Sequence, residues 1–310
     1  MNNLSSVSIV MASYNGDKFI REQIDSILKN TYQDWTLEIC DDGSTDKTLE
    51  IVEEYADKYP NKINLHRNER NLGVVINFLE GAKRAKGKYI MFCDQDDVWL
   101  PNKIEYTMDQ MKKSESRFGA DTPLTVFTDA KVVDIRLRTL EESFFEASSL
   151  DVSKVDIAHL LMENKLLGCT VMFNQSLINK IIEFPDFARY HDWWVGLISA
   201  SFGKIVYLNE PTLLYRQHGG NVVGNVSFFQ YVRNRLRGIK EQKRILELTE
   251  KQAWNFLEIY GRELSEEIRT IVYDFAYLGN YSFFKRRKLI LEKKYLKTGI
   301  IRNIGILLLI

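Results

Sequence analysis

Three carboxylates crowd together in the sequence, where Asp94, Asp96 and Asp97 follow the apolar run 89–93. A short apolar run with aromatic and β-branched residues is typical of a strand in a sheet covered on both faces. Like charges at the carboxyl end of a strand repel one another unless a cation or a proton compensates them. Because oxygen ligands suit Mg²⁺ and Mn²⁺, the stretch predicts a site for one of these ions. A solvated acidic loop that leads into the helix beginning near Pro101 is the structural alternative.

Two further polar loops follow predicted strands. Residues 13–15, Ser-Tyr-Asn, come after the apolar strand 7–11, and Asp42 comes after the strand 35–40. Because parallel strands bring their carboxyl ends to one crevice, we expect these loops to converge on the acidic one. There Tyr14 can stack on a base, and Asp42 can accept the imide N–H of a pyrimidine. Each also has an ordinary interpretation, as a packed aromatic ring and as a turn acid that bonds its own backbone.

The elements around these loops alternate between strand and helix. Apolar residues at helical spacing predict helices between the strands, and further strands are expected at 63–66 and 125–128. We expect Ser44 or Thr45 to cap the second helix and Asn71 to cap the third. This order predicts an α/β fold with a mostly parallel central sheet, right-handed crossovers and flanking helices. The sequence contains no G-x-G-x-x-G and no P-loop lysine motif, which argues against dinucleotide-binding proteins and nucleoside triphosphatases.

Later residues can supply a base and an apolar wall. Asp192 precedes Trp193 and Trp194 at the start of a helical pattern. A carboxylate desolvated by indole rings suits a general base, although aspartate is also a favoured N-cap residue. Arg216 can contact a diphosphate as a planar donor. His218, later in the same stretch, reads on its own as a satisfied histidine in a turn.

Ordered motifs carry a family resemblance. They are residues 7–15 (Val-Ser-Ile-Val-Met-Ala-Ser-Tyr-Asn), 41–46 (Asp-Asp-Gly-Ser-Thr-Asp), 71–73 (Asn-Leu-Gly) and 87–97 (Gly-Lys-Tyr-Ile-Met-Phe-Cys-Asp-Gln-Asp-Asp). These resemble bacterial family 2 glycosyltransferases with the GT-A fold. Residues 93–101, 191–194 (His-Asp-Trp-Trp) and 215–221 (Tyr-Arg-Gln-His-Gly-Gly-Asn) resemble the subset that transfers rhamnose in cell-wall and O-antigen polysaccharide synthesis. The resemblance covers roughly residues 5 to 225.

The resemblance implies a nucleotide site and a metal site. Asp42 matches the acid that reads the nucleotide base, and Tyr14 lies in the loop that packs beside it. Asp94 matches the nucleotide motif. Asp96 matches the direct ligand of Mg²⁺ or Mn²⁺, and His218 matches a histidine that approaches the metal or the diphosphate.

The resemblance also implies a catalytic base. Asp192 matches the base of inverting members. In this chain it follows His191, where many relatives carry a small or acidic residue. The remaining site candidates are Asn15, Asp97, Trp193 and Arg216.

Charge and composition bear on partners and location. The chain of 310 residues has no formal net charge, but residues 228–310 hold 17 basic and 9 acidic side chains. The acidic front half argues against a nucleic-acid partner, whereas the basic tail, interleaved with apolar residues, predicts contact with an anionic membrane surface. A basic helix that packs its apolar face on the catalytic domain is the structural alternative. A polar start, no membrane-spanning stretch and three cysteines without metal-ligand spacing (Cys40, Cys93 and Cys169) predict a cytoplasmic protein, peripheral at the inner face of the cell membrane.

These observations predict two regions. Residues 1–225 form a GT-A catalytic domain, with a nucleotide-binding half at 1–100 and an acceptor-binding half at 101–225. Residues 226–310 form a helical, basic region that associates with membranes.

The predicted function is an inverting glycosyltransferase that moves L-rhamnose from dTDP-rhamnose onto a lipid-linked saccharide acceptor of cell-wall or surface polysaccharide synthesis. A UDP-sugar donor for the same machinery is the first alternative. A non-catalytic nucleotide- or sugar-binding partner is the second, although such a protein need not keep Asp42, Asp96 and Asp192. A metal-dependent nucleotidyltransferase is the third, and the sequence lacks the Gly- and Lys-rich phosphate loop expected for it.

Overall fold

A mixed sheet lies at the centre of the molecule. The computed structural model describes residues 6–218 and 239–309. Within them nine strands form one sheet in the order β3-β2-β1-β4-β8-β6-β9-β5, with β7 paired to β6. The strands are β1 (Val7–Ser13), β2 (Trp35–Asp41), β3 (Ile63–Arg67), β4 (Tyr89–Cys93), β5 (Val98–Trp99), β6 (Leu124–Val133), β7 (Thr139–Glu141), β8 (Val171–Asn174) and β9 (Lys204–Arg216). The helices up to β9 are α1 (Ile20–Leu28), α2 (Thr48–Lys58), α3 (Val74–Arg84), α4 (Lys103–Phe118), α5 (Phe144–Ala147), α6 (Ile157–Met162), α7 (Gln175–Ile178), α8 (His191–Phe202) and the 3₁₀ turn η1 (Gly168–Thr170).

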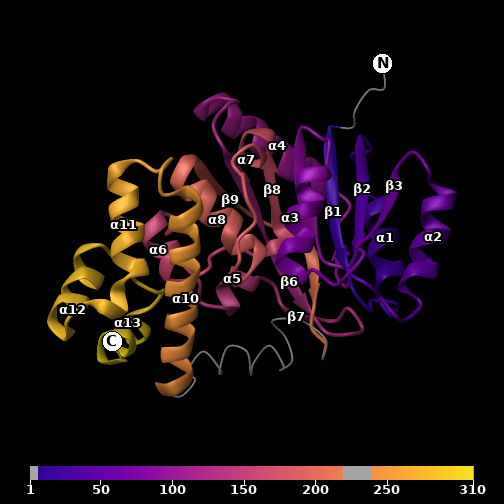
Figure 1. The fold of residues 1–310 in the computed structure, drawn as a ribbon. Coiled ribbons are helices and arrows are strands. Elements are labelled where there is room, and N and C mark those ends of the chain that lie inside the picture. The colour runs from indigo at the N-terminus through magenta and orange to yellow at the C-terminus, as the bar shows by residue number, and fades with distance from the viewer. Residues whose placement is uncertain (1–5, 219–238, 310) are drawn as a thin grey trace.

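The first four strands pair in parallel, as the sequence predicts. The chain runs outward from β1 to β3 and returns to β4 on the other side of β1, so right-handed crossovers place α1 and α2 on one face and α3 on the other. The contacts agree, because α1 packs on α2, whereas α3 packs on β1, β2 and α8. Figure 1 shows α1 and α2 beside this half of the sheet. The carboxyl ends of β1, β2 and β4 therefore lie along one edge.

The second half of the sheet departs from the prediction. β8 runs antiparallel to β4 and β6, and β5 runs antiparallel to β9, whereas β6 and β9 are parallel. The sheet is therefore mixed and not mostly parallel. β6 is also longer than the predicted strand 125–128, and Asp129 lies inside it at a register shift with β9. Strands buried on both faces read as continuous apolar runs whichever way they pair, so the pattern does not specify their direction.

The predicted N-caps of two helices are wrong. At the start of α2 the Asp46 side chain accepts a hydrogen bond from the Thr48 amide at 2.9 Å, in place of Ser44 or Thr45. No side chain caps α3, and Asn71 lies in the loop before it. The side chains of Ser44, Thr45 and Asn71 instead form hydrogen bonds between neighbouring loops at the carboxyl edge of the sheet.

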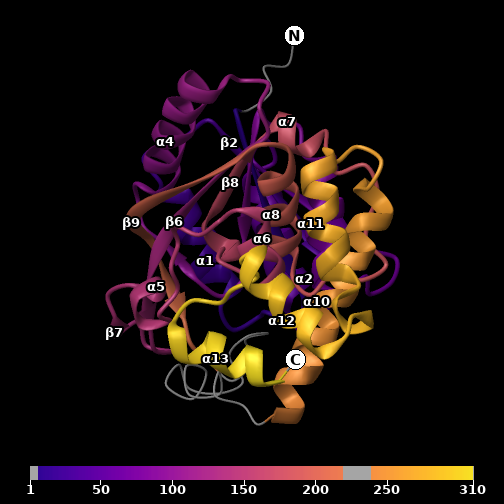
Figure 2. The ribbon, with the colours of Figure 1, turned by 90° about the vertical axis from the view of Figure 1, so that its left-hand side faces the viewer.

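Four helices and a 3₁₀ turn form a C-terminal layer. They are α10 (Ile239–Tyr260), α11 (Glu266–Ala276), η2 (Leu278–Asn280), α12 (Phe283–Glu292) and α13 (Ile300–Leu309). Figures 1 and 2 show this layer at the end of the molecule away from α2, and α10 and α11 contact α6. The helical character predicted for this region is confirmed. The predicted boundary at 225/226 and residues 219–221 of the last motif lie outside the described residues.

Trp194 belongs to the interface with this layer. Its ring lies 5.4 Å from that of Phe256 and 6.2 Å from that of Tyr260, both on α10. Because successive helical residues point about 100° apart, Trp193 and Trp194 cannot both face one cleft. The expectation that Trp194 forms a wall for the sugar is therefore wrong. None of the helices in the ranges that the structure describes is long and apolar enough to cross a membrane.

Candidate active site

A cleft of about 810 Å³ lies at the carboxyl edge of β1, β2 and β4. Its walls come from the three polar loops, from α3, α6 and α8, and from the C-terminal α10 and α13. The volume is in the range of sites for small molecules. Of the predicted site residues, the lining includes Tyr14, Asp42, Asp94, Asp96, Asp192 and Trp193. The others, Asn15, Asp97, Arg216 and His218, lie behind or beside it.

Asp42 is buried and holds the loop before α3. Its Oδ1 accepts hydrogen bonds from Leu72 N at 2.7 Å and from Asn68 Nδ2 at 2.9 Å, and its Oδ2 accepts one from Gly73 N at 2.8 Å. The carboxylate therefore bonds a distant loop and not its own backbone; neighbouring Asp41 fills the role of turn acid, through Gly43 N and Ser44 N. Because an ionised carboxylate offers about four acceptor positions, one remains for a ligand N–H.

Tyr14 is half exposed, and its backbone is fixed by the acidic loop. Gln95 accepts a hydrogen bond from Tyr14 N and donates one to Tyr14 O, both at 3.0 Å. Asn15, with a φ of 49°, lies outside the cleft lining, and its Oδ1 accepts the Thr45 amide at 2.8 Å. The first loop is thus tied to the loops after β2 and β4, and the ring of Tyr14 is left at the cleft surface.

The acidic loop concentrates negative charge in a buried place. The carboxylates of Asp94 and Asp97 and the Sγ of Cys169 lie within 4.8 Å of one another. Burial and the charges of Asp97 and Asp96 raise the pKa of Asp94 well above its usual range. Burial and the charge of Asp96 raise the pKa of Asp97 to about 7. A divalent cation relieves this repulsion, and the carboxylate oxygens suit Mg²⁺ or Mn²⁺, whereas a cysteine sulfur suits softer metals.

Asp96 and His218 point toward each other beside this cluster. Nε2 of His218 lies 2.8 Å from Oδ2 of Asp96, and the His218 ring packs on Phe19 with 4.6 Å between the ring centres. A carboxylate suits both Mg²⁺ and Mn²⁺, whereas an imidazole nitrogen suits a transition metal such as Mn²⁺ better than Mg²⁺. The structure thus brings together the two residues predicted to hold the metal.

Arg216 is occupied by the protein and does not line the cleft. Its Nε donates to Asp96 O at 2.8 Å, its Nη1 donates to Ile135 O at 2.9 Å, and its Nη2 pairs with Glu22. Its backbone N donates to Asp97 Oδ1 at 3.0 Å. A guanidinium used in this way fixes the backbone of the acidic loop, so the predicted contact with the diphosphate is replaced by a positioning role.

Asp192 lies in the first turn of α8, at the cleft surface. Its Oδ2 accepts a hydrogen bond from Asn164 Nδ2 at 3.0 Å, and its Oδ1 accepts one from the Trp193 amide at 2.7 Å. Burial raises the pKa of Asp192 to about 6, although these hydrogen bonds favour the charged form. The N-cap of α8 is Tyr190, so Asp192 is not the cap. A carboxylate with this pKa is ionised at neutral pH and basic enough to accept a proton.

His191 is a buried neutral ring and not a second charge in the site. It stacks on Phe78 at 3.8 Å between ring centres and meets Phe92 edge-on at 5.1 Å. Burial lowers the pKa of His191 to about 3. Gly168 leaves room for it, because a Cβ there would come within 2.6 Å of His191 Nε2. His191 therefore adds no positive charge that would lower the pKa of Asp192.

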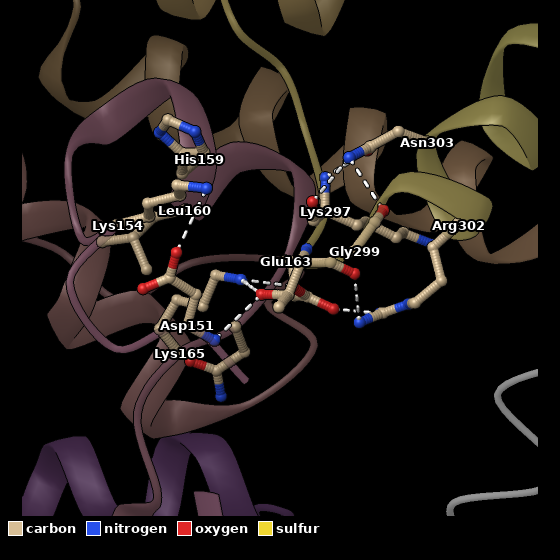
Figure 3. A network of polar contacts seen from close by, with 12 residues as sticks. Asp151, Lys154, His159, Leu160, Glu163, Lys165, Lys297, Gly299, Arg302 and Asn303 are labelled. Carbon is tan, nitrogen blue, oxygen red and sulfur yellow. Dashed lines mark hydrogen bonds and ion pairs between the residues drawn. The ribbon is translucent and has the colours of Figure 1, made fainter. Parts of the chain in front are cut away.

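The segment 163–166 connects Asp192 to the C-terminal helices. Glu163 pairs with the buried Lys165 and with Arg302 of α13, and accepts the Thr298 amide at 2.8 Å. Figure 3 shows Glu163 between these two cations. Asn164, the next residue, donates to Asp192. The sequence analysis did not identify Glu163 or Asn164 as site residues, because a few polar residues in an apolar stretch match no known motif. The only signal in the sequence was the run Glu-Asn-Lys at 163–165 among apolar neighbours.

Comparisons with known proteins agree with this geometry. The model of the family "Glycosyl transferase family 2" matches residues 8–141. The dTDP-rhamnosyl transferase RfbG of Shigella flexneri is 28% identical over 95% of this chain and 100% of its own length. The UDP-Glc:alpha-D-GlcNAc-diphosphoundecaprenol beta-1,3-glucosyltransferase WfgD of Escherichia coli is 31% identical over 66% of this chain and 73% of its own length.

A solved structure shares the fold. The mannosyltransferase PcManGT from Pyrobaculum calidifontis, in complex with GDP-Man and Mn²⁺, superimposes with a TM-score of 0.55 at 14% identity, over 94% of this chain and 74% of that one. The predicted GT-A-like α/β fold is thereby confirmed. The chain belongs to glycosyl transferase family 2 and is a glycosyltransferase.

Proposed function

We propose that the protein is an inverting, metal-dependent glycosyltransferase that moves L-rhamnose from dTDP-rhamnose to a lipid-linked saccharide. One observation carries this proposal: the acidic loop with Asp94 and Asp96 and the carboxylate of Asp192 line the same cleft, next to Asp42. Transfer of a sugar needs a group that receives the leaving diphosphate and a base for the attacking hydroxyl. The cleft holds candidates for both.

Asp96 and His218 would hold the metal, and Asp94, in the same loop as Asp96, lines the cleft. When bound, Mg²⁺ or Mn²⁺ neutralises the negative charge that develops on the leaving nucleoside diphosphate. Asp42 offers its remaining acceptor position to the N–H of a pyrimidine base, and Tyr14 offers its ring as a stacking surface. Arg216 keeps the backbone of the acidic loop in place.

Asp192 would act as the general base. It takes the proton of the acceptor hydroxyl as the oxygen attacks the anomeric carbon, and a single displacement inverts that carbon. Asn164 keeps one carboxylate oxygen oriented, and the ring of Trp193 lines the cleft beside it. Burial of Asp192 excludes water that would compete with the acceptor.

The donor assignment is supported by the relative whose whole length the chain covers, which is named a dTDP-rhamnosyl transferase. The relative named for UDP-Glc keeps a UDP-hexose as the second candidate. The same relative is named for a diphosphoundecaprenol-linked acceptor, which supports a lipid-linked acceptor here.

A membrane partner is part of the proposal. Phe284, Ile300, Ile301 and Leu308 are between 77% and 82% exposed on α12 and α13. Four consecutive basic residues, 285–288, lie on α12 among them. Exposed apolar side chains and cations on these two helices suit an anionic bilayer, which supports a location at the cytoplasmic face of the cell membrane.

The test is a donor screen. The purified protein is incubated with dTDP-rhamnose, UDP-glucose or GDP-mannose in the presence of Mn²⁺, and released nucleoside diphosphate is measured with and without a membrane extract as the acceptor source. We expect release from dTDP-rhamnose that increases with the extract and stops with EDTA. Release from UDP-glucose alone would mean that the donor is a UDP-hexose and would leave the proposed mechanism unchanged. No release from any donor would contradict the proposal that the protein is an enzyme.

A further inference from the structure

The segment 163–166 is bonded to two distant parts of the chain. Glu163 forms an ion pair with Arg302 of α13. The next residue, Asn164, donates a hydrogen bond to Asp192 Oδ2 at 3.0 Å. Consecutive Cα atoms lie only about 3.8 Å apart across a trans peptide bond, so a movement of one residue is passed to the next. The contact with the C-terminal layer and the contact with the carboxylate of α8 are therefore made by adjacent residues.

The side chain of Asn164 is bonded at both ends of its amide. Its Nδ2 donates to Asp192, and its Oδ1 accepts a hydrogen bond from the Leu166 amide at 3.0 Å. Because the oxygen and the nitrogen of the amide are both in use, the orientation of this side chain follows the backbone of the segment. A shift of the segment would therefore change the hydrogen bond that Asp192 receives.

Glu163 has two cationic partners from different parts of the chain. Lys165 is fully buried and belongs to the same segment, whereas Arg302 comes from α13, and its side chain is 23% exposed. Figure 3 shows the Glu163 carboxylate between them. Loss of Arg302 leaves this carboxylate paired with Lys165, so no buried charge is left without a counter-charge. A substitution at Arg302 thus removes the link to α13 and keeps the local ion pair.

The chain just before α13 is docked on the same segment. The Thr298 amide donates to Glu163 Oε2 at 2.8 Å. Thr298 Oγ1 accepts hydrogen bonds from the Lys165 ammonium and, at 3.0 Å, from the Asp151 amide. Arg302 Nη1 donates to Thr298 O at 3.2 Å, so the guanidinium connects this docked turn to Glu163. The start of α13 is held against the segment by both backbone and side-chain groups.

We propose that α13 positions the catalytic base: Arg302, through Glu163 and Asn164, holds the carboxylate of Asp192 in the orientation needed for proton transfer. This inference rests on the proposed function, since it concerns the base of the same reaction. A misplacement of a reacting group by about 1 Å can lower a rate about 10²-fold, so the position of such a segment matters for turnover. Arg302 is then a positioning residue and does not itself touch the substrate.

Two titratable groups outside the segment lie next to Asp192. The charge of Asp192 contributes to the raised pKa of Asp94, so the two carboxylates act on each other within the cleft. His191 precedes Asp192 and is neutral, because burial lowers its pKa to about 3. A substitution at Arg302 alters neither group. A change in the pH dependence of such a variant therefore reports on the hydrogen bond from Asn164 or on the charge of Arg302 itself.

The first test compares Arg302→Gln with the wild type, both as the full-length protein. We expect the rate at saturating donor and membrane extract to fall about tenfold or more, and the affinity for dTDP with Mn²⁺ to stay the same. The acidic limb of the pH–rate profile should move to higher pH, because a weakened hydrogen bond from Asn164 no longer favours the ionised carboxylate. An unchanged profile in Arg302→Gln would overturn the inference.

Two further variants calibrate this test. Arg302→Lys keeps the positive charge and loses the planar fork, so it should show the same changes to a smaller extent. Arg84→Gln, at an exposed arginine that pairs with Glu80 on α3 outside the cleft lining, is the matched control and should behave as the wild type. Melting temperatures within a few degrees of the wild type show that each comparison is made on folded protein.

A double variant tests the route through Asn164. Arg302→Gln combined with Asn164→Ala should be no slower than Asn164→Ala alone, because both changes remove the same hydrogen bond to Asp192. If Arg302 acted on Asp192 directly through its charge, or on access of the acceptor, the two losses in rate would multiply. Losses that multiply would overturn the inference.

The same assays separate this inference from the proposed function. If the wild type releases nucleoside diphosphate and Asn164→Ala moves the pH–rate profile while Arg302→Gln does not, the role of α13 is wrong and the glycosyltransferase mechanism is retained. If the wild type releases no nucleoside diphosphate from any donor, the proposed function is wrong, and the positioning role is wrong with it.

Discussion

At the scale of single residues, the chemistry depends on the carboxylate of Asp192. Burial raises its pKa to about 6, so the group is protonated below that pH and ionised above it. A general base works only in the ionised form. We therefore expect the rate of transfer at saturating donor to rise with pH, to be half-maximal near pH 6, and to level off about one pH unit above it. A rate that does not change between about pH 4.5 and about pH 8 would contradict this role.

Asp192→Asn should lower the rate of transfer by about 10²–10⁴-fold and leave the affinity for the nucleotide unchanged. The amide has nearly the same shape as the carboxylate and cannot accept the proton. The rate is measured by release of nucleoside diphosphate in the presence of acceptor, and the affinity by calorimetry. Retained turnover in the variant would remove Asp192 from the mechanism.

Asn164 contributes by orienting that base. Its hydrogen bond to Asp192 Oδ2 favours the ionised carboxylate, so Asn164→Ala should move the acidic limb of the pH–rate profile to higher pH. A purely structural role for Asn164 would reduce the rate at every pH alike. Asn179→Ala, at the exposed asparagine that follows α7, serves as the control and should leave the pH–rate profile unchanged.

At the scale of elements, α13 is joined to the catalytic region by a buried ion network. Burial alone raises the pKa of Glu163, but the charges of Lys165 and Arg302 outweigh it and hold that pKa at about 2. A carboxyl whose pKa is lower in the folded state stabilises the fold above its unfolded value of about 4.3. This stabilisation is lost as the pH falls from there toward 2.

Glu163→Gln should therefore destabilise the protein by about 3–5 kcal/mol near neutral pH, since it leaves Lys165 and Arg302 without their counter-charge. Urea unfolding at pH 7 and pH 3 measures the effect. The difference between the variant and the wild type should shrink at pH 3. Lys154→Gln, on a half-exposed ion pair with Asp151, is the control and should cost less than about 1 kcal/mol.

The sequence was informative for elements whose pattern is local. The strands at 7–13, 35–41, 63–67 and 89–93 and the convergence of their loops follow from apolar runs and from the rule for parallel strands. The direction of β8, the return of Arg216 into the acidic loop and the pairing of Glu163 with Arg302 depend on contacts between residues far apart in the chain. No local pattern records such contacts, so the sequence could name Arg216 as a polar site residue but could not show that its donors are already used.

At the scale of the whole molecule, the C-terminal layer has two different faces. Its inner side, with Arg302 and the buried Ile306, packs on the catalytic region, and its outer side exposes Ile300, Ile301 and Leu308. The docked helix of the sequence analysis thus matches the inner face of α13, and the proposed membrane contact would use the outer face. Deletion after Gly299 removes Arg302 as well, so it would not separate membrane binding from folding.

Ile301→Gln combined with Leu308→Gln changes only the exposed face. We expect this double variant to remain folded and to lose most of its binding to vesicles that contain anionic lipid, in a flotation assay. The wild type should bind less at high salt, because part of the attraction is between basic residues and the lipid surface. If the double variant floats with the vesicles as the wild type does, the outer face of α13 does not bind the membrane.

The central claim is that a metal held at the acidic loop recruits a nucleoside diphosphate sugar. It is tested most directly by titrating dTDP, UDP and GDP into the protein with Mn²⁺ and with EDTA, for the wild type and for Asp96→Ala. We expect dTDP to bind most tightly, only with Mn²⁺ present, and at least tenfold more weakly to Asp96→Ala. Binding that is equally tight without metal and in the variant, or no binding of any nucleotide, would contradict the assignment of this cleft as a donor site.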